Sequence, residues 1–316
     1  MMTAYTITFP GQWIAADQFE QALRQASTYT FSQRAGVTFR FLPSCKMMVD
    51  AAVRLLSLAN QLAAEGVPVT MMFEEEQNGV MSYLNRANFF MLLSPQICVL
   101  PGWPDTSLAR RYYGYNKSLV EFEPVNPADR ERSSDIPTKL RDALMTAIEG
   151  QPETFGGAAF TIFAELINNI YDHSQTMLDG FAALQVYARG SKVQVVVSDS
   201  GVGLLETLRP KLLTQTSKDL PDGELVRSLF RDDLEWKSEG KGQGLHACAS
   251  KALKYNGSVD IRLATCRIQL QPSHGLYERA AMSSQSNLTP IQGTHVCFSF
   301  GLPDTSFIRR DRIDFE

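Results

Sequence analysis

The chain has 316 residues, of which 44% are hydrophobic, so it can bury a large core and is long enough for two domains. Its formal net charge of −4 and pI near 5.7 give no overall attraction to nucleic acid or to an anionic membrane, so the composition indicates neither as a partner. No basic segment followed by an apolar one opens the chain, and no apolar run approaches the roughly 18–20 residues of a membrane span, so we expect a cytoplasmic protein.

The first third of the chain is predicted to alternate strands and helices. This order implies parallel strands joined by helical crossovers. The predicted strands are Tyr5–Phe9, Val37–Leu42 and Pro68–Phe73, and the predicted helices are Ala15–Ala26, about Lys46–Ala64, and Val80–Leu92.

Residues 95–135 are rich in proline and are predicted to form a loop. They contain the basic and aromatic run ARRYYGYNK, which we interpret as part of a packed interdomain connection in preference to a surface for an anionic partner. A helix is predicted from Ile136 to Glu149.

The stretch Thr161–Ser174, TIFAELINNIYDHS, is predicted to be an amphipathic helix. Glu165, Asn169 and His173 fall at i, i+4 and i+8, so they stack along one stripe beside the apolar face. Taken alone, this stripe is typical of a solvated polar face. The segments that follow it change that interpretation.

Two predicted strands, Ala182–Ala188 and Val193–Ser198, lead directly into Asp199-Ser-Gly201-Val-Gly203. Glycines just past a buried strand let a ligand approach the main chain closely. We therefore expect the carboxylate of Asp199 to point into a pocket at the strand end. On its own, a DxGxG sequence is a common turn composition.

Residues 204–241 are polar with poor periodicity, and we interpret them as a mobile segment. The segment ends in the glycine-rich turn GKGQGL, and a helix is predicted over His246–Tyr255. Free N–H groups and the helix dipole make such a turn a phosphate site, although it is not a Walker A loop. The remaining predicted strands, Ser258–Leu263, Arg267–Gln271 and Thr294–Phe300, suit one antiparallel sheet, with a polar loop at Tyr277–Gln292.

In this order, these motifs resemble the Bergerat nucleotide-binding fold of the GHKL superfamily, which includes gyrase B subunits, heat-shock chaperones of the ninety-kilodalton class, MutL proteins and sensor histidine kinases. The resemblance covers about residues 165–301, and the form ELxxNxxxHS is most similar to the branch of kinases and bacterial anti-sigma factors. Residues 30–95 resemble the STAS-like domains of anti-sigma-factor antagonists through the strand VPVTMMF and the phrase YLxRxxFF. Ser44, in the turn LPSCK, matches their phosphorylated position only nominally, and we interpret it as a helix N-cap.

The two resemblances imply an α/β (α+β) protein with a STAS-like α/β domain at residues 1–105, a connecting segment and helix at 106–150, a two-layer Bergerat-type sandwich at 151–303 and a tail at 304–316. They also imply a role for each matched residue. Asp199 would bind the adenine amino group with help from Thr294, Asn169 would ligate Mg²⁺, and Glu165 would activate the water that attacks ATP. Gly201 and Gly203 would shape the adenine pocket, and Lys241, Gly242, Gly244 and Leu245 would bind the phosphates.

These roles predict an ATP- and Mg²⁺-binding switch that hydrolyses ATP slowly and signals to a protein partner. One alternative is a serine kinase of the anti-sigma-factor type acting on a STAS partner; histidine autophosphorylation is disfavoured because the four histidines, His173, His246, His274 and His295, all lie in the C-terminal half. Another alternative is the ATPase subunit of a nucleic-acid-processing or defence complex, which would need a further polypeptide. Superfamily members often dimerise when ATP binds, although no heptad pattern here identifies an interface.

Overall fold

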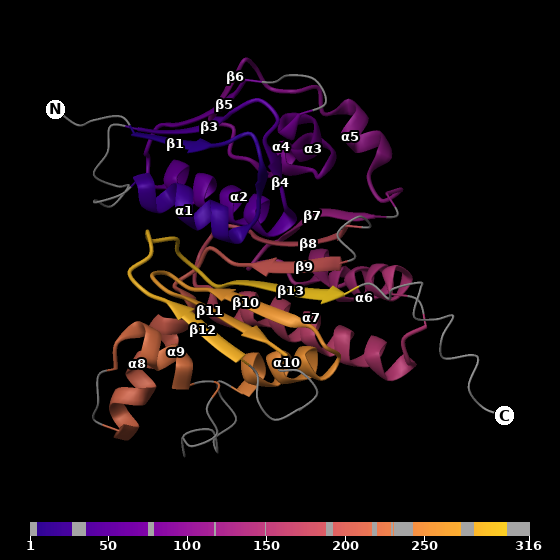
Figure 1. Cartoon of the computed structure of the whole chain (residues 1–316), viewed down its shortest axis with the longest axis vertical. Coiled ribbons are helices and arrows are strands. Elements are labelled where there is room, and N and C mark those ends of the chain that lie inside the picture. The colour runs from indigo at the N-terminus through magenta and orange to yellow at the C-terminus, as the bar shows by residue number, and fades with distance from the viewer. Residues whose placement is uncertain are drawn as a thin grey trace.

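The structure is a computed structural model of the whole chain, and it describes residues 5–26, 36–74, 79–116, 118–148, 150–187, 192–216, 220–228, 230, 243–272 and 281–301. In Figure 1 a parallel sheet, a pair of helices, an antiparallel sheet and a second set of helices follow one another from top to bottom. The fold is therefore mixed α/β with parallel and antiparallel sheets. Among the described helices, none combines the length and the hydropathy needed to cross a bilayer.

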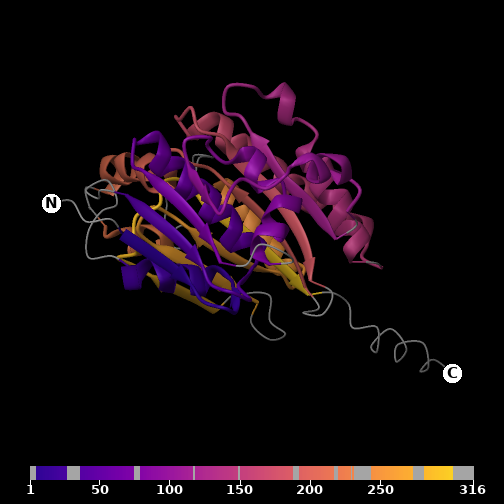
Figure 2. The same ribbon diagram turned by 90° about the horizontal axis from the view of Figure 1, so that it is seen from above.

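A four-stranded parallel sheet with the order β1-β3-β5-β6 forms the first layer, and Figure 2 shows it lying over the larger sheet. Its register sets Phe9, Phe41 and Phe73 side by side, with ring centroids 5.2 Å apart for the first pair and 4.5 Å apart for the second. Phe19 of the first helix continues this stack, 5.9 Å from Phe9. The strands are β1 (Tyr5–Phe9), β3 (Val37–Phe41), β5 (Val69–Phe73) and β6 (Cys98–Leu100), and a separate parallel pair is β2 (Trp13–Ile14) with β4 (Lys46–Met47).

Helix α2 (Val49–Ala64) lies between the two sheets, beside α1 (Ala16–Ala26). Of its 16 residues 14 are buried, so it is an interior helix that shares one apolar core with both sheets. Its polar residues Asp50, Arg54, Ser57 and Gln61 follow one another at helical spacing, and all four hydrogen-bond to the antiparallel half of the protein. Burial of these groups is tolerated because each has a partner there.

The antiparallel sheet has seven strands in the order β12-β11-β10-β13-β9-β8-β7. Its edge strand β7 is capped by the turn between α3 and α4, since the N–H of Phe122 donates to the oxygen of Ala87 at 2.9 Å and Nδ2 of Asn88 donates to the oxygen of Phe122 at 3.1 Å. The strands are β7 (Leu119–Val125), β8 (Gly180–Tyr187), β9 (Lys192–Ser198), β10 (Ser258–Arg262), β11 (Arg267–Gln271), β12 (Ala281–Gln285) and β13 (His295–Gly301).

The far face of this sheet is covered by a second helical layer, built mainly from α6, α7 and α10. The apolar side of α7 that the sequence predicts is buried there, including Ile162, Phe163, Leu166, Ile167 and Ile170. The helices of this half are α6 (Ile136–Ala147), α7 (Glu153–His173), α8 (Gly203–Thr216), α9 (Asp222–Ser228) and α10 (Gln243–Lys254); the other half adds α3 (Val80–Arg86), α4 (Phe89–Leu92) and α5 (Ser107–Tyr112), and a 3-10 turn spans Glu131–Ser133.

Buried charges join the first helical layer to the antiparallel sheet. Glu20 of α1 accepts from Nε of Arg262 at 2.9 Å and from Arg54 at 3.4 Å, and the side chains of all three are at most 2% exposed. Arg54 also donates to Asp260 at 2.9 Å. Burial by itself would raise the pKa of Asp260, yet Arg54 and Arg267 hold that pKa below its ordinary value.

Three segments in which no helix or strand was predicted contain regular structure; the loop predictions for residues 95–135 and Tyr277–Gln292 are therefore wrong, whereas the mobility of residues 204–241 stays a prediction. Residues 95–135 contain β6, α5 and β7, and the predicted connecting segment 106–150 thus supplies β7 and α6 to the antiparallel half. Residues 204–241 contain α8 and α9, and the predicted loop Tyr277–Gln292 contains β12. β7 and β12 are both edge strands, which tolerate the proline and polar residues that obscured them.

Some helix boundaries also differ from prediction. The helix expected from Lys46 begins at Val49, because Lys46 and Met47 pair with β2. The helix expected over Val80–Leu92 divides at Asn88, whose φ of 69° is left-handed. The parallel pairing of β3 with β5 confirms the predicted crossover.

The ion pairs of Glu20 give a test of how tightly the layers are joined. We expect Glu20→Ala to lower the free energy of unfolding by about 3–5 kcal/mol, because it leaves Arg262 buried without its carboxylate partner and leaves Arg54 with Asp260 alone. Glu74→Ala, which removes the partly exposed pair with Arg40, is the control and should cost less than about 1 kcal/mol. Urea unfolding measures the free energy of unfolding of both variants. Equal losses would contradict the conclusion that the buried ion pairs of Glu20 join the two layers.

Candidate functional site

Asp199 follows the last residue of β9, and both oxygens of its carboxylate accept main-chain hydrogen bonds. Oδ1 accepts from the N–H of Gly201 at 2.8 Å, and Oδ2 accepts from the N–H of Thr294 at 3.1 Å. Burial raises the pKa of Asp199 to about 6 against the lowering effect of these hydrogen bonds. Each oxygen has a second lone pair, so the carboxylate can still accept from a ligand that carries N–H donors.

Thr294, just before β13, ties three segments together at this point. Its oxygen accepts from the N–H of Asp199 at 3.0 Å, and its Oγ1 accepts from the N–H of Leu204 in the first turn of α8 at 3.2 Å. Gly293 before it has a φ of 95°, and a Cβ there would lie 2.0 Å from the main-chain oxygen of Asp199. A glycine is therefore required for the two strand ends to approach this closely.

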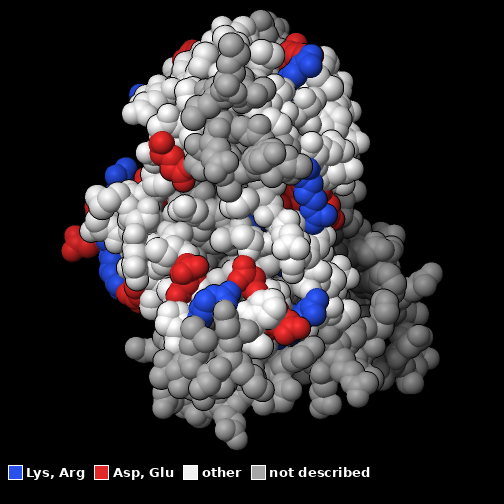
Figure 3. Space-filling model, turned by 90° about the vertical axis from the view of Figure 1, so that its left-hand side faces the viewer, with Lys and Arg blue, Asp and Glu red and all other residues white. Residues whose placement is uncertain are grey.

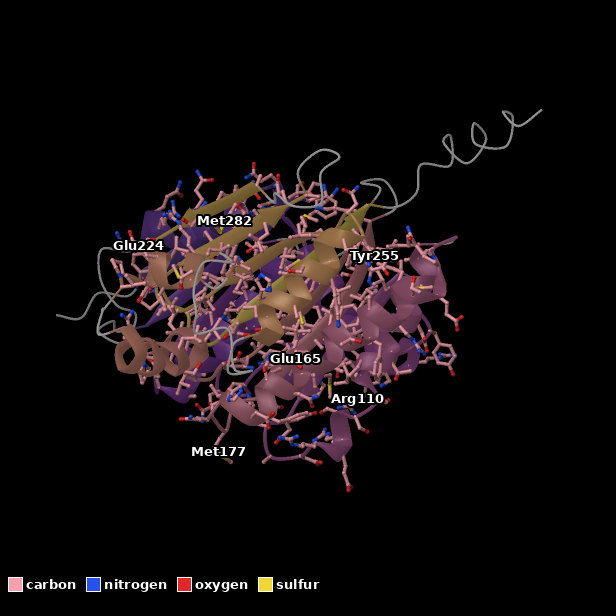
Figure 4. The ribbon with its side chains drawn as sticks, turned by 90° about the horizontal axis from the view of Figure 1, so that it is seen from below. Arg110, Glu165, Met177, Glu224, Tyr255 and Met282 are labelled. Carbon is pink, nitrogen blue, oxygen red and sulfur yellow. The ribbon has the colours of Figure 1, made fainter. Side chains whose placement is uncertain are left out.

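The polar stripe of α7 forms the opposite wall, as its spacing predicts. Glu165 and Asn169 are half-buried, His173 is exposed, and all three line one cavity with Asp199 and Thr294. Figure 4 shows Glu165 on the helix-covered side of the antiparallel sheet, close to α10. The four-residue spacing thus aims three polar side chains at the end of β9.

Helix α10 brings its N-terminal turn to the same cavity. A Cβ on Gly244 would lie 2.0 Å from Oε1 of Glu165, so the carboxylate of Glu165 lies directly against this turn. Leu245 is buried and also lines the cavity. The predicted phosphate-binding residues Lys241 and Gly242 lie outside the described residues.

The cavity measures about 200 Å³ and is bounded by α7, β9, α8, α10 and β13. Its polar lining consists of Glu165, Asn169, His173, Asp199 and Thr294, with further polar contact from Thr207. Its apolar and glycine lining consists of Leu166, Ile170, Val197, Gly203, Leu204, Leu208, Gly244, Leu245 and Val296. Every predicted site residue within the described part of the chain therefore lines this cavity, except Gly201.

Gly201 contributes from behind the cavity. Besides donating to Asp199, it packs against the main chain of Ser174 at the end of α7, where a Cβ would lie 2.0 Å from the Ser174 oxygen. The N–H of Val202 donates to that same oxygen at 2.9 Å. Gly201 therefore fixes the end of α7 against the turn that carries Asp199.

The contribution of α8 to the site was not predicted from the sequence. Leu204, Thr207 and Leu208 of α8 line the cavity, and their spacing of three and four residues was a helical signal inside a segment interpreted as mobile. His173, predicted to share one stripe with Glu165 and Asn169, lines the cavity with them. Asp172, next to it, ion-pairs with Arg130, and the Arg130 guanidinium lies 5.0 Å from the centre of the Tyr171 ring.

The described residues contain no cluster of three or more His, Cys, Asp or Glu side chains that could hold a metal ion. A metal in this cavity would therefore take most of its ligands from a bound molecule and from water. The amide oxygen of Asn169 is a hard donor of the kind that Mg²⁺ accepts alongside phosphate oxygens.

Acidic and basic side chains are interspersed on the face shown in Figure 3. The described residues of that face thus form no extended basic surface of the kind that binds nucleic acid.

In comparisons with known proteins, no family model matches the chain and no curated protein matches it.

The contact of Gly201 with Ser174 can be tested by adding a single methyl group. We expect Gly201→Ala to lower the free energy of unfolding by about 1–3 kcal/mol, because two main-chain segments would have to separate. Gly157→Ala in α7 is the control: its Cβ would meet nothing within 4 Å, so it should gain about 0.5–1 kcal/mol of helix stability. Urea unfolding of both variants measures these changes. An unchanged free energy of unfolding in Gly201→Ala would contradict the close contact between Gly201 and Ser174.

Proposed function

We propose that the chain is an ATP- and Mg²⁺-binding protein of the GHKL type, with a Bergerat-type pocket, that acts as a nucleotide-dependent switch for a protein partner. One observation carries the proposal. Glu165, Asn169, Asp199, Gly244 and Thr294 come from four separate segments of the chain and line a single cavity. That order of motifs was the basis of the resemblance, and their convergence is what a nucleotide site requires.

Asp199 supports the choice of adenine as the base. A carboxylate oxygen that already accepts one N–H can take a further donor, and the adenine amino group is such a donor. Guanine offers a carbonyl oxygen at the equivalent place, which would face the carboxylate without a proton between them. Val197, Leu208 and Val296 in the cavity wall suit the faces of a planar base.

The donor set fits a nucleotide-bound Mg²⁺. Asn169 would supply one amide oxygen, and the remaining ligands would be phosphate oxygens and water, since the described residues form no cluster of ligands for the ion. When bound, the ion would neutralise phosphate charge. The N-terminal turn of α10 at Gly244 lies beside this position and presents main-chain N–H groups with the positive end of the helix dipole.

Glu165 is placed to act on water. Its carboxylate lies against Gly244, one helical turn from Asn169 on the same face of α7. From there it would orient a water molecule toward the terminal phosphate and accept its proton. Slow hydrolysis of this kind would return the switch to its starting state.

The N-terminal half would be the signalling part of this switch, and we propose a STAS-like module for it. The parallel sheet with helices on one face is consistent with that assignment. Direct packing of α2 on β8 and β9 gives the nucleotide half a physical connection to it. A change at the cavity would then reach a surface on which a protein partner could bind.

Titration calorimetry with a non-hydrolysable ATP analogue and Mg²⁺ tests the pocket. Wild-type protein should bind, Asp199→Asn should weaken binding at least about 10-fold because a buried acceptor is lost, and Asn169→Ala should weaken it only when Mg²⁺ is present.

Asn168→Ala is the matched control for this series, because Asn168 is the exposed neighbour of Asn169 and does not line the cavity. It should bind like the wild type. The proposal fails if the wild type does not bind at millimolar analogue, or if Asn168→Ala and Asn169→Ala behave alike.

Release of inorganic phosphate from ATP tests the role of Glu165. We expect Glu165→Gln to keep the affinity for the analogue and to lose at least about 100-fold in turnover, because the amide cannot accept a proton from water. His173→Gln, on the same wall of the cavity, should retain most of the turnover. Equal rates for wild type and Glu165→Gln would leave binding intact and remove hydrolysis from the proposal.

A further inference from the structure

Gln61, near the end of α2, makes two hydrogen bonds to the segment that carries Thr294. Its Nε2 donates to the main-chain oxygen of Gln292 at 3.0 Å, and its Oε1 accepts from the main-chain N–H of Gln292 at 3.0 Å. Gln61 is buried, and its amide thus pairs with both main-chain polar groups of one residue. Gln292 is two residues from Thr294, whose N–H binds Asp199.

A second chain of hydrogen bonds starts one turn earlier on the same helix. The hydroxyl of Ser57 lies 2.9 Å from that of Ser198, which lies 2.6 Å from Nδ1 of His295, and Nε2 of His295 lies 3.1 Å from the Gln292 oxygen. A carbonyl oxygen can only accept, so Nε2 carries the proton toward Gln292.

Burial lowers the pKa of His295 well below its ordinary value, and the nearby charges of Arg54 and Arg262 act in the same direction. The ring is therefore neutral, and Nδ1 must accept from the hydroxyl of Ser198. Ser198 can in turn accept from Ser57. All donors in the chain then point the same way, from α2 toward the Gln292 oxygen, which receives two hydrogen bonds in total.

Both connections reach Gln292, two residues before Thr294, and the second one passes through neighbours of both Asp199 and Thr294. Ser198 precedes Asp199, and His295 follows Thr294. We infer that Gln61 and Ser57 are positioning residues for the base-binding pair Asp199 and Thr294, so that the N-terminal half sets the affinity and base selectivity of the cavity. This inference rests on the proposed function, and it adds that the site is completed by a helix from the other half of the chain.

The chain offers a matched control in Asn60, the neighbour of Gln61. Its Nδ2 donates to the oxygen of Leu92 at 2.9 Å, and its Oδ1 accepts from the N–H of Ser94 at 2.8 Å. Asn60 therefore makes the same double amide contact with main chain, from the same helix and at similar distances. Its partners lie in the N-terminal half, and neither Leu92 nor Ser94 lines the cavity.

The test compares Gln61→Met, Ser57→Ala and Asn60→Ala in the full chain by titration calorimetry with non-hydrolysable ATP and GTP analogues. We expect Gln61→Met to weaken binding of the ATP analogue about 5- to 30-fold and to reduce the preference for adenine over guanine. Ser57→Ala should act in the same direction. Asn60→Ala should leave the affinity for the ATP analogue and the preference for adenine within about twofold of the wild type, even if it lowers the unfolding temperature as much as Gln61→Met does.

Hydrogen exchange of the unliganded protein gives a second readout that needs no nucleotide. The amides of Thr294 and Leu204, which bond to Asp199 and Thr294, should exchange faster in Gln61→Met than in Asn60→Ala. Equal exchange in the two variants overturns the inference, as does equal loss of affinity. If the wild type binds no nucleotide, the proposed function fails, and the exchange result alone decides whether Gln61 positions this segment.

Discussion

The structure depends on the burial of one polar helix face between two sheets. This face consists of Asp50, Arg54, Ser57 and Gln61 of α2, which are at most 5% exposed. Leaving any of these buried polar groups without a partner would destabilise the folded protein. Each has a hydrogen-bond partner in the antiparallel half, on β9, β10 or the segment before β13, although Asp50 and Arg54 also bond to groups of α1. Moving the parallel sheet away would leave both α2 and the strand ends with unpaired buried groups. The relative position of the two halves is therefore fixed by hydrogen bonds and charges as well as by apolar packing.

This constraint explains why the cavity lies where it does. The ends of β9 and β13 are supported by α2 on one face of the antiparallel sheet and face α7 and α10 on the other. The supported ends carry Asp199 and Thr294. Because burial raises the pKa of Asp199 to about 6, its ionised form is held at a cost that a ligand with N–H donors would offset. Hydrogen bonds from such a ligand would therefore stabilise the ionised carboxylate of Asp199.

The sequence was sufficient for the parts of the fold that follow from local patterns. The spacing of Glu165, Asn169 and His173, the strand before Asp199 and the parallel pairing of β3 with β5 were all predictable, because each depends on a period of 3.6 or 2 residues or on the order of elements. The edge strands β7 and β12 were not, since the proline of β7 and the polar residues of both strands obscure that period. The contact of Gln61 with Gln292 spans 231 residues, and no local pattern records such a pair.

On the proposed function, the polar stripe of α2 would serve regulation as well as stability. Interactions that hold two bodies together are thermodynamically linked to any ligand whose site they shape, and that linkage is reciprocal for binding free energies. If α2 holds Thr294 in place for a base, then a bound base must in turn favour the arrangement of α2 that makes those hydrogen bonds. A partner that binds the N-terminal half and shifts α2 would change the binding free energy of the base, and the base would change that of the partner by the same amount. The separation of Asn60, which contacts only its own half, from Gln61, which contacts the cavity segment, divides the two tasks between adjacent residues of one helix.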